Sequence, residues 1–521
     1  MSLLSIENLS LSIRGTPILR DVSLQIAPGE ILGVIGESGS GKSLTAFSVL
    51  QLLPDGSECS GAVKLLGQDV LNLSEDALCA MRGRDVGMVF QEPMTALNPV
   101  QTIGQQVAET ILIHERVTKA EATTRAAEAL ERAELPNAKF PLSRYPHELS
   151  GGQRQRVVIA MAIALQPKLL IADEPTTALD VTTQAEILDL LARLVREDGM
   201  GLMLISHDLA VVTDMADRIA IMKDGEVVEE GGADLHRTMQ HPYTKALFAA
   251  SSHQPERLAS PEKTPLLQVL NATRDYTLPR KSLLGAAETF RAVDGVSFEI
   301  MRGESLGLVG ESGCGKSTLT RAILGLETLQ GGSIHLNGVP IEQAEKRQMQ
   351  VVFQDPYGSF NPRHKVARLV GEPFHLLGRK PTDQELDEAL TSVGLTPDDK
   401  HKYIHEFSGG QRQRIAIARA LIIKPDLIVL DEAVSALDVS IRAQILDLLA
   451  ALSDSHNLTY LFISHDLSVV RAITDRCLVM RAGQIVEQGV TEQLFTDPQH
   501  AYTKSLIAAA PVLPDPELEP S

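Results

Sequence analysis

The chain has 521 residues, a formal net charge of -19 and an apolar content of 44%. This length exceeds the ~250–300 residues at which a single hydrophobic core stops growing, so more than one domain is expected. The acidic balance argues against a broad surface for phosphate backbones, which requires clustered Lys and Arg, and no nucleic-acid partner is expected.

Neither the cysteines nor the hydropathy indicate an extracellular or membrane-embedded protein. The four cysteines, Cys59, Cys79, Cys314 and Cys477, form no C-x-x-C pair, which fits a reducing compartment. The first residues lack the charged start and apolar core of a signal peptide. The longest apolar run, 157–165, is shorter than the ~20 residues that a membrane helix needs. Association with a membrane would therefore require a partner protein.

The chain opens with strand patterns that lead to a glycine-rich loop. Period-two alternation predicts a strand over 4–13, and further strands are expected at 22–26 and 31–35. The third strand is followed by Gly36-Glu37-Ser38-Gly39-Ser40-Gly41-Lys42-Ser43, which reads G-x-x-x-x-G-K-[ST]. Residues 44–50 suit the helix that such a loop requires. The sequence therefore predicts a phosphate-binding loop, in which Lys42 faces the phosphates and Ser43 offers a hydroxyl to Mg²⁺.

Strands and helices alternate through the rest of the first half. Further strands are expected at 62–66, 85–91, 169–174 and 202–208. The last three end on polar side chains, which are Gln91, the pair Asp173 and Glu174, and His207. Residues 102–134 have a helical pattern and are expected to form a separate lobe. Together these patterns predict an α/β fold with a mainly parallel sheet.

Every motif of the first half returns in the second half in the same order. The phosphate-binding loop recurs as Gly310-Glu311-Ser312-Gly313-Cys314-Gly315-Lys316-Ser317. Gln354 follows Gln91 by 263 positions, and Asp431, Glu432 and His465 follow their counterparts by 258. This self-similarity predicts a duplicated domain. We expect a first domain at 1–250, a linker at 251–265, a second domain at 266–510 and a disordered tail at 511–521, which is rich in Pro and acidic residues.

A second pair of motifs carries a family resemblance. Leu149 precedes Ser150-Gly151-Gly152-Gln153, and Phe407 precedes Ser408-Gly409-Gly410-Gln411. With these motifs the chain resembles the ATP-binding subunits of ABC transporters along nearly its whole length. The resemblance implies two tandem P-loop nucleotide-binding domains, each with a RecA-like, mainly parallel sheet, an antiparallel β part and a helical subdomain.

Shorter features are similar to one group within that family. They are the Gly-Glu-Ser-Gly sequence in both loops, the Gln-acid-Pro turns at 91–93 and 354–356, and the segment His241-Pro242-Tyr243-Thr244, which is repeated with one change at 500–503. These features resemble the double-length ATPases of the peptide and nickel importer group, including its Yej-type and glutathione-type members. We therefore expect the chain to belong to that group.

The residue types and the resemblance together assign roles at two ATP sites. Glu174 and Glu432 are expected to polarise the attacking water, and His207 and His465 to contact the γ-phosphate. The expected Mg²⁺ ligands are Ser43, Gln91 and Asp173 at the first site and Ser317, Gln354 and Asp431 at the second. Gln91 and Gln354 are also expected to touch the attacking water. With both sets complete, two working sites are predicted.

The resemblance also implies how the two domains cooperate. Ser408 to Gln411 would close on ATP at Lys42, and Ser150 to Gln153 on ATP at Lys316, so that ATP joins a head-to-tail sandwich. The family often stacks an aromatic ring on adenine, at the position of Tyr276. The first copy has Ile13 there, so its site should either hold adenine less specifically or use an aromatic ring from elsewhere.

An iron–sulfur cluster, which some peptide-importer ATPases carry, is not expected, because no cysteine lies between Cys79 and Cys314. We expect an ATPase that powers an importer, with peptide as the solute, at the cytoplasmic face of a bacterial inner membrane. It would bind two polytopic permease subunits through grooves beside Gln91–Pro99 and Gln354–Pro362, and an external solute-binding protein would act indirectly.

Two alternatives remain open from the sequence. One is an importer ATPase for nickel or another small solute, since the ATPase itself does not touch the cargo. The other is a soluble tandem ATPase acting on ribosomes, a class that resembles two domains joined by a long charged helix. The short, Pro-containing joint and the acidic composition disfavour the second alternative.

Overall fold

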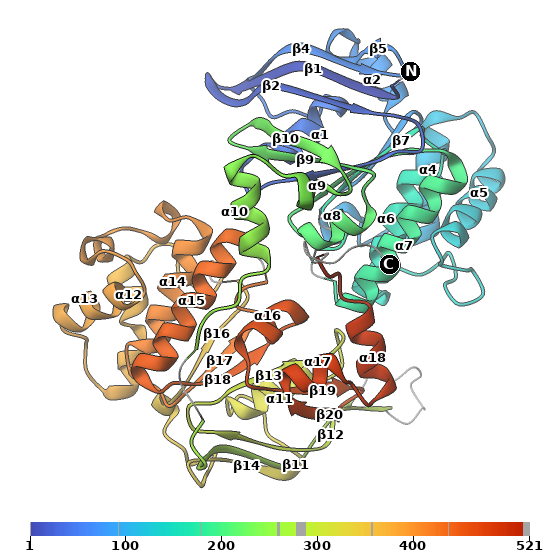
Figure 1. Ribbon diagram of the computed structural model, residues 1–521. Coiled ribbons are helices and arrows are strands. Elements are labelled where there is room, and N and C mark those ends of the chain that lie inside the picture. The colour runs from blue at the N-terminus through green and yellow to red at the C-terminus, as the bar shows by residue number, and fades with distance from the viewer. Residues whose placement is uncertain are drawn as a thin grey trace. The chain divides into compact units, whose positions relative to one another are not determined.

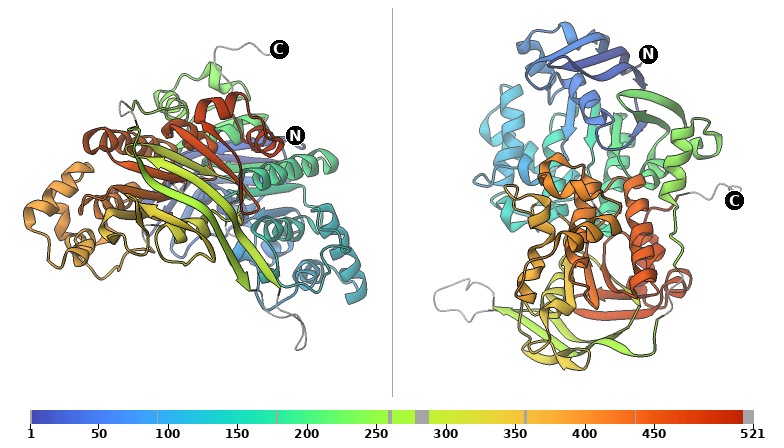
Figure 2. Two further views of the ribbon diagram at one scale, coloured as in Figure 1. Left: turned by 90° about the horizontal axis from the view of Figure 1, so that it is seen from below. Right: turned by 90° about the vertical axis from the view of Figure 1, so that its left-hand side faces the viewer.

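The computed structural model describes residues 2–91, 93–177, 179–257, 261–277, 288–355, 358–435 and 437–513. Most of the tail expected to be disordered, at 514–521, lies outside these residues, as do Glu92 and Pro356 of the two Gln-acid-Pro turns. The chain divides into two compact units, seen in Figures 1 and 2. The first contains Met1–Leu179 and Thr183–Ser252, and the second contains His253–Ala510.

The first unit contains two β-sheets. The antiparallel sheet has the order β2-β1-β4-β5, with β2 (Thr16–Ile26), β1 (Leu4–Ile13), β4 (Ser57–Leu65) and β5 (Gln68–Asp69). The core sheet has the order β10-β9-β3-β8-β7-β6, with β10 (Glu226–Gly232), β9 (Arg218–Lys223), β3 (Ile31–Ile35), β8 (Gly201–Ser206), β7 (Leu169–Asp173) and β6 (Val86–Val89). All neighbours in the core sheet are parallel except β9 and β10.

Helices of the first unit connect these strands or form a lobe of their own (Figure 1). The lobe holds α3 (Pro93–Ala96), α4 (Ile103–His114), α5 (Lys119–Arg132) and α6 (Gly151–Ile163). The other helices are α1 (Lys42–Leu50), α2 (Glu75–Met81), α7 (Val181–Asp198), α8 (Leu209–Met215), α9 (Leu235–Thr238) and α10 (Pro242–Ser251).

The second unit repeats this architecture. Its antiparallel sheet contains β12 (Thr289–Met301), β11 (Pro265–Thr277), β14 (Gly331–Leu336) and β15 (Val339–Pro340). Its core sheet contains, in order, β16 (Met349–Val352), β17 (Leu427–Asp431), β18 (Thr459–Ile463), β13 (Ser305–Val309), β19 (Arg476–Arg481) and β20 (Gln484–Val490). Its helices are α11 (Lys316–Ile323), α12 (Val366–Val370), α13 (Asp383–Ser392), α14 (Gly409–Leu421), α15 (Val439–His456), α16 (Leu467–Ile473), α17 (Thr491–Thr496) and α18 (Ala501–Ala508).

This architecture confirms the predicted fold, while several element boundaries differ from the prediction. The helical stretch predicted at 102–134 is two helices, because Thr118 caps a new helix by accepting a hydrogen bond from the Glu121 N–H at 3.2 Å. The strand predicted at 22–26 begins earlier, at Thr16, because Arg14 and Gly15 have φ of 51° and 80° and close a hairpin.

The central strand of each core sheet is fully buried. All five residues of β3 and of β13 are buried, and burial of a large aliphatic side chain contributes roughly 1.5–3 kcal/mol. Gly33 lies where α8 covers the sheet, and a Cβ there would come within 2.0 Å of Val212 Cγ1. Gly307 has the same role under Val470 of α16. The strand that leads to each phosphate-binding loop therefore packs closely against the helix that covers it.

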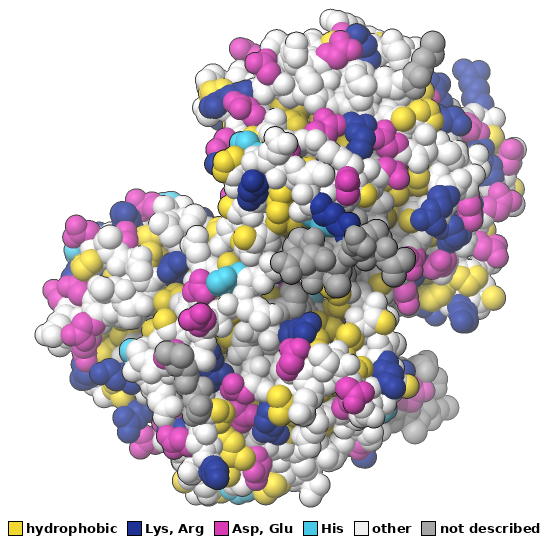
Figure 3. Space-filling view, in the orientation of Figure 1, with side chains coloured by type: hydrophobic (Ala, Val, Ile, Leu, Met, Phe, Trp, Pro, Cys, Tyr) yellow, Lys and Arg dark blue, Asp and Glu magenta, His cyan; other side chains and the backbone are white. Residues whose placement is uncertain are grey.

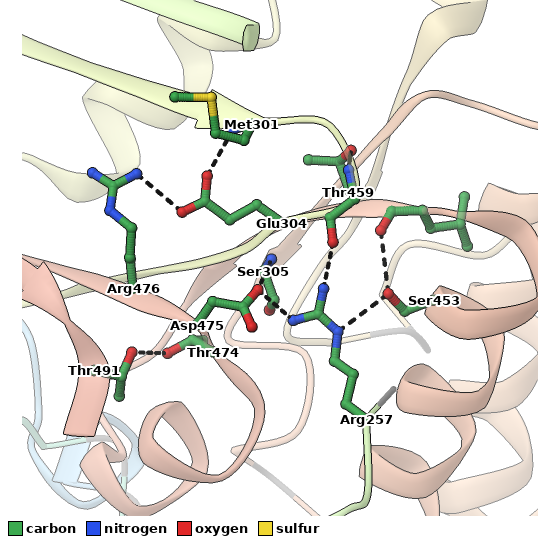
Figure 4. A network of polar contacts seen from close by, with 12 residues as sticks. Arg257, Met301, Glu304, Ser305, Ser453, Thr459, Thr474, Asp475, Arg476 and Thr491 are labelled. Atoms are coloured by element: carbon green, nitrogen blue, oxygen red, sulfur yellow. Dashed lines mark hydrogen bonds and ion pairs between the residues drawn. The ribbon is translucent and has the colours of Figure 1, made fainter. Parts of the chain in front are cut away.

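The segment that precedes β11 is attached to the second unit by Arg257 (Figure 4). The guanidinium donates to Asp475 Oδ2 at 2.6 Å, to the Gly303 carbonyl at 2.5 Å and to Ser453 Oγ at 3.3 Å. Asp475 also accepts the Ser305 N–H at 2.8 Å, at the start of β13. Part of the expected linker is therefore bound to the second unit.

Surface charge is mixed on the face shown in Figure 3, where Lys and Arg side chains are interspersed with Asp and Glu. In the part of the chain that the structure describes, no helix combines the length and apolar character needed to cross a membrane.

Candidate active site

The phosphate-binding loop of the first unit leaves β3 and enters α1, whose first residue is Lys42. Gly36 has no room for a side chain, because a Cβ there would lie 2.3 Å from the Met222 carbonyl oxygen of β9. Gly41 precedes the helix with a φ of 100°, which L side chains rarely adopt. The loop backbone therefore lies close to the sheet and turns sharply into the helix, as a phosphate cradle requires.

The loop of the second unit has the same geometry. A Cβ on Gly310 would lie 2.2 Å from the Met480 carbonyl oxygen, and Gly315 has a φ of 114°. Cys314 replaces Ser40 of the first loop and is buried. Burial raises the pKa of the Cys314 thiol, so it stays neutral near pH 7 and adds no charge to the loop.

Both lysines lie inside their loops. Lys42 Nζ donates to the carbonyls of Gly36 at 2.6 Å and Glu37 at 3.0 Å. Lys316 Nζ donates to the equivalent carbonyls of Gly310 and Glu311, at 2.6 and 2.9 Å. Each lysine is only 7% exposed. Each positive charge is thus held within the loop, where the phosphates of a nucleotide would bind.

Asp173 ends β7 beside Ser43. The Asp173 side chain is buried, and this burial raises its pKa, while a hydrogen bond from Ser43 opposes the rise. Its Oδ1 atom is buried without a hydrogen-bond partner among the described residues. Mg²⁺ favours such a donor set, since it binds one or two protein oxygens together with phosphates and water. Ser43 and Asp173 therefore fit the predicted metal position.

Glu174 directly follows β7 and is the centre of a polar cluster. Its carboxylate accepts hydrogen bonds from Gln91 Nε2 at 2.7 Å and Thr177 Oγ1 at 3.0 Å, and lies 3.2 Å from His207 Nδ1. Its φ of 48° lies in the left-handed region, which is uncommon for a residue with a side chain. Burial would raise the pKa of Glu174, but the hydrogen bond and charge of His207 outweigh it and lower that pKa. The structure thus brings together three residues that the sequence predicted for hydrolysis.

The second site has the same pair and a different glutamine contact. Glu432 Oε1 lies 3.2 Å from His465 Nδ1, and this hydrogen bond lowers the pKa of Glu432. Burial lowers the pKa of His465, but the bond to Glu432 outweighs it and the net shift is upward. Gln354 Nε2 contacts Ser435 Oγ at 3.5 Å instead of the glutamate. Burial raises the pKa of Asp431 as it does for Asp173.

A cavity of about 520 Å³ lies at this second site. Its lining includes Ser317, Gln354, Asp431 and Glu432. The structure therefore gathers the predicted metal ligands and the predicted catalytic carboxylate of the second site around one open space.

The two signature segments are the Ser-Gly-Gly-Gln motifs at 150–153 and 408–411. Their serines cap the helices α6 and α14. Ser150 Oγ accepts the Gln153 N–H at 3.3 Å, and Gln153 Oε1 accepts the Ser150 N–H at 3.1 Å. Ser408 and Gln411 form the same capping box, at 3.4 and 3.0 Å. Gly151 and Gly409 are exposed, whereas Gly152 and Gly410 are buried against Thr183 and Ile441. Among the described hydrogen bonds, none joins a signature to the phosphate-binding loop of its own unit.

The two predicted adenine positions differ in their surroundings. Tyr276 is the last residue but one of β11. Its hydroxyl donates to Glu327 Oε2 at 2.5 Å, and the Arg274 guanidinium lies 4.9 Å from its ring centroid. Ile13 ends β1 and packs against the hydrophobic core of its unit. Tyr276 is therefore held by polar partners, whereas Ile13 is part of a packed apolar surface.

Sequence reasoning missed one contact in each site. The Glu37 N–H of the first loop donates to Tyr243 Oη at 3.3 Å, and the Glu311 N–H donates to Tyr502 Oη at 3.0 Å. Both tyrosines belong to the repeated His-x-Tyr-Thr segments at the starts of α10 and α18. The repetition of these segments was the one available signal.

The ABC transporter family matches residues 19–177 and 293–435. The chain belongs to that family and is one of its ATPases. The C-terminal region of oligopeptide and dipeptide transporters matches residues 486–520.

Several curated proteins are similar over nearly the whole chain. The glutathione import ATP-binding protein GsiA of Escherichia coli O157:H7 is 44% identical, over 98% of this chain and 90% of its own. The peptidoglycan transport ATP-binding protein YejF of Agrobacterium fabrum is 45% identical, over 98% of this chain and 96% of its own. A solved dimeric cassette bound to ADP and Pi is 33% identical, with a TM-score of 0.40, over 44% of this chain and 98% of its own.

Proposed function

We propose that the chain powers an importer of peptides by hydrolysing ATP at two sites. The observation that carries this proposal is the identity of 44–45% over 98% of the chain to import and transport ATP-binding proteins. The solutes in those names, glutathione and peptidoglycan, both contain peptide bonds. The match of residues 486–520 to oligopeptide and dipeptide transporters supports the same class of solute.

At each site the proposed chemistry is positioning and charge stabilisation rather than covalent catalysis. Lys42 and Lys316 neutralise the phosphates, and Ser43 with Asp173, or Ser317 with Asp431, hold Mg²⁺ together with Gln91 or Gln354. When bound, Mg²⁺ would neutralise charge on the β- and γ-phosphates.

The carboxylates orient the attacking water in this proposal. Their lowered pKa keeps Glu174 and Glu432 ionised near pH 7, which lets them accept a hydrogen bond from water. Both carboxylates contact a histidine, so His207 and His465 must exchange this contact for one with the γ-phosphate. The same histidine thereby controls when the carboxylate is free to act.

The signature segments act on the nucleotide of the opposite domain in this proposal. Ser150, Gly151, Ser408 and Gly409 are exposed at helix N-termini, which favour anions. ATP would then hold the two domains in a head-to-tail sandwich, and its hydrolysis would release them. The glutamines at 153 and 411 cap their own helices, so their contribution is to keep the serine in place.

Membrane association is proposed to be peripheral, at the cytoplasmic face of the inner membrane, through two polytopic permease subunits. The proposed docking segments follow Phe90 and Phe353, which are each 40% exposed at the ends of β6 and β16. In the first lobe Val100 and Ile113 are exposed as well, at 80% and 72%. An external solute-binding protein would deliver the cargo to these permease subunits.

A pull-down from cell lysate tests the proposal. The bait is the Glu174→Gln, Glu432→Gln double variant with ATP and Mg²⁺, which should trap the ATP-bound state, and the same bait without nucleotide is the control. Recovery of two polytopic membrane proteins with a solute-binding protein that retains a bound peptide supports the importer. Recovery of ribosomes alone would overturn it, and a partner that binds nickel would replace the proposed solute.

A further inference from the structure

The second helix after each core sheet, α10 or α18, contacts the phosphate-binding loop of its own unit. Tyr243, the second residue of α10, accepts the Glu37 N–H, and Tyr502, the second residue of α18, accepts the Glu311 N–H. The two contacts occur at equivalent positions of two units whose sequences have diverged. Pro242 of the first motif is Ala501 in the second, so the tyrosine contact is kept where the proline is not.

The contacted amide belongs to the peptide that also binds the catalytic-site lysine. The Gly36 carbonyl accepts Lys42 Nζ at 2.6 Å, and the N–H of the same peptide unit is the Glu37 N–H. A peptide unit is planar and trans, so its C=O and N–H point in opposite directions. Tyr243 and Lys42 therefore hold opposite sides of one peptide plane. Rotation of that plane would break both contacts.

The second unit repeats this arrangement with a shorter tyrosine contact and the same lysine distance. Tyr502 Oη lies 3.0 Å from the Glu311 nitrogen, and Lys316 Nζ lies 2.6 Å from the Gly310 carbonyl oxygen. Tyr502 is 4% exposed, and burial raises its pKa to about 12. The phenol therefore stays protonated at neutral pH, and its oxygen accepts the amide as a neutral group.

Each tyrosine is fixed by its own motif. In the first unit His241 Nδ1 caps α10 by accepting the Tyr243 N–H at 3.2 Å, and Glu229 of β10 accepts the His241 N–H at 3.2 Å. The Lys223 ammonium lies 5.0 Å from the Tyr243 ring centroid, a distance suited to a cation–π contact.

The equivalent contacts are present in the second unit. His500 Nδ1 accepts the Tyr502 N–H at 3.1 Å, Glu487 accepts the His500 N–H at 3.0 Å, and the Arg481 guanidinium lies 4.7 Å from the Tyr502 ring. The edge strand, the histidine cap and the ring contact together set where the hydroxyl meets the loop.

We propose that Tyr243 and Tyr502 are positioning residues for ATP binding, through which the helices α10 and α18 hold the phosphate-binding loops in their binding conformation. The inference rests on the proposed assignment of these loops as the ATP sites. Because coupling between two sites is reciprocal, ATP in the loop must in turn stabilise the docked helix. The His-x-Tyr-Thr segment thus links the C-terminal part of each unit to nucleotide affinity.

The second unit offers the cleaner test, because it contains a matched control tyrosine. Tyr460 is fully buried and donates its hydroxyl proton to the Leu449 carbonyl at 3.0 Å. Tyr460→Phe and Tyr502→Phe each remove one buried hydroxyl, but the structure places only Tyr502 on the loop. Both are made in the full chain carrying Lys42→Ala, so that only the site at Lys316 binds nucleotide.

Isothermal titration with Mg²⁺ and the ATP analogue adenylyl imidodiphosphate measures the Kd. Tyr502→Phe is expected to raise the Kd about fivefold, which is the effect of losing one neutral hydrogen bond. Tyr460→Phe is expected to lower the Tm and leave the Kd unchanged. An unchanged Kd in Tyr502→Phe, or an equal rise in Tyr460→Phe, would overturn the inference.

Two further measurements separate this inference from the site assignment. Lys316→Ala in the same background must abolish binding; if binding persists, the proposed site itself is wrong and the inference falls with it. Hydrogen exchange of the α18 amides must slow when the analogue binds, and this protection must be lost in Tyr502→Phe but not in Tyr460→Phe. If the exchange rate of the α18 amides is the same with and without the analogue, the coupling is refuted even if the site assignment holds.

Discussion

Replacing one catalytic carboxylate at a time tests whether both sites hydrolyse ATP. Glu174→Gln and Glu432→Gln keep the shape of the side chain and remove its charge. The lowered pKa of each glutamate shows that its environment stabilises the ionised form, which the amide cannot adopt. A positioned base contributes roughly 10²–10⁴-fold to such a reaction, so the changed site should retain at most about 1% of its rate.

The activity that remains reports how the sites cooperate. With two equal and independent sites, each single variant keeps about half of the steady-state ATPase rate, and with sites coupled through one sandwich it keeps far less. The assay is phosphate release by the full chain at saturating Mg²⁺ and ATP. Glu128→Gln, an exposed residue of α5, is the matched control and should be unaffected. Full activity in either single variant would show that the glutamate assigned to that site does not act there.

Three further variants test other parts of the structure. Arg257→Ala should lower the free energy of unfolding of the second unit by about 2–4 kcal/mol, because it removes three hydrogen bonds and the positive charge beside Asp475. A calorimetric Tm that does not change would contradict this. Arg442 lies 2.6 Å from Asp466 and, against burial, lowers the Asp466 pKa. A depressed carboxyl pKa stabilises the fold above the unfolded value of ~3.9 and stops doing so as pH falls through the folded pKa. Arg442→Gln should therefore lower the Tm at pH 7 but converge with the unchanged protein in acid, and a pH-independent difference would refute the pairing. Tyr276→Ile, which copies Ile13, should weaken ATP binding at the second site by about three- to tenfold if the ring stacks on adenine, and a titration in which inorganic tripolyphosphate, which has no base, is weakened as much as ATP would point to packing instead.

Local sequence patterns were sufficient to predict the strands that border the site. The predicted strand at 31–35 coincides with β3, and the strand at 169–174 differs from β7 by one residue, because an apolar run ended by carboxylates is a local signal. The turn at 14–15 was harder to predict from the sequence, because Arg14 adopts a positive φ although it is neither Gly nor Asn. The Tyr243 contact was beyond sequence reasoning for a different reason. It joins residues 206 positions apart, and no periodicity marks such a pair.

The Arg257 anchor shortens the covalent tether between the two units. Ser252 follows α10 as the last residue of this part of the first unit, and Arg257 is bound to the second unit, five positions later in the chain. An extended chain spans at most ~3.6 Å per residue, so these two points can separate by no more than about 18 Å while the anchor holds. This short covalent connection therefore gives each unit a high effective concentration of its partner unit.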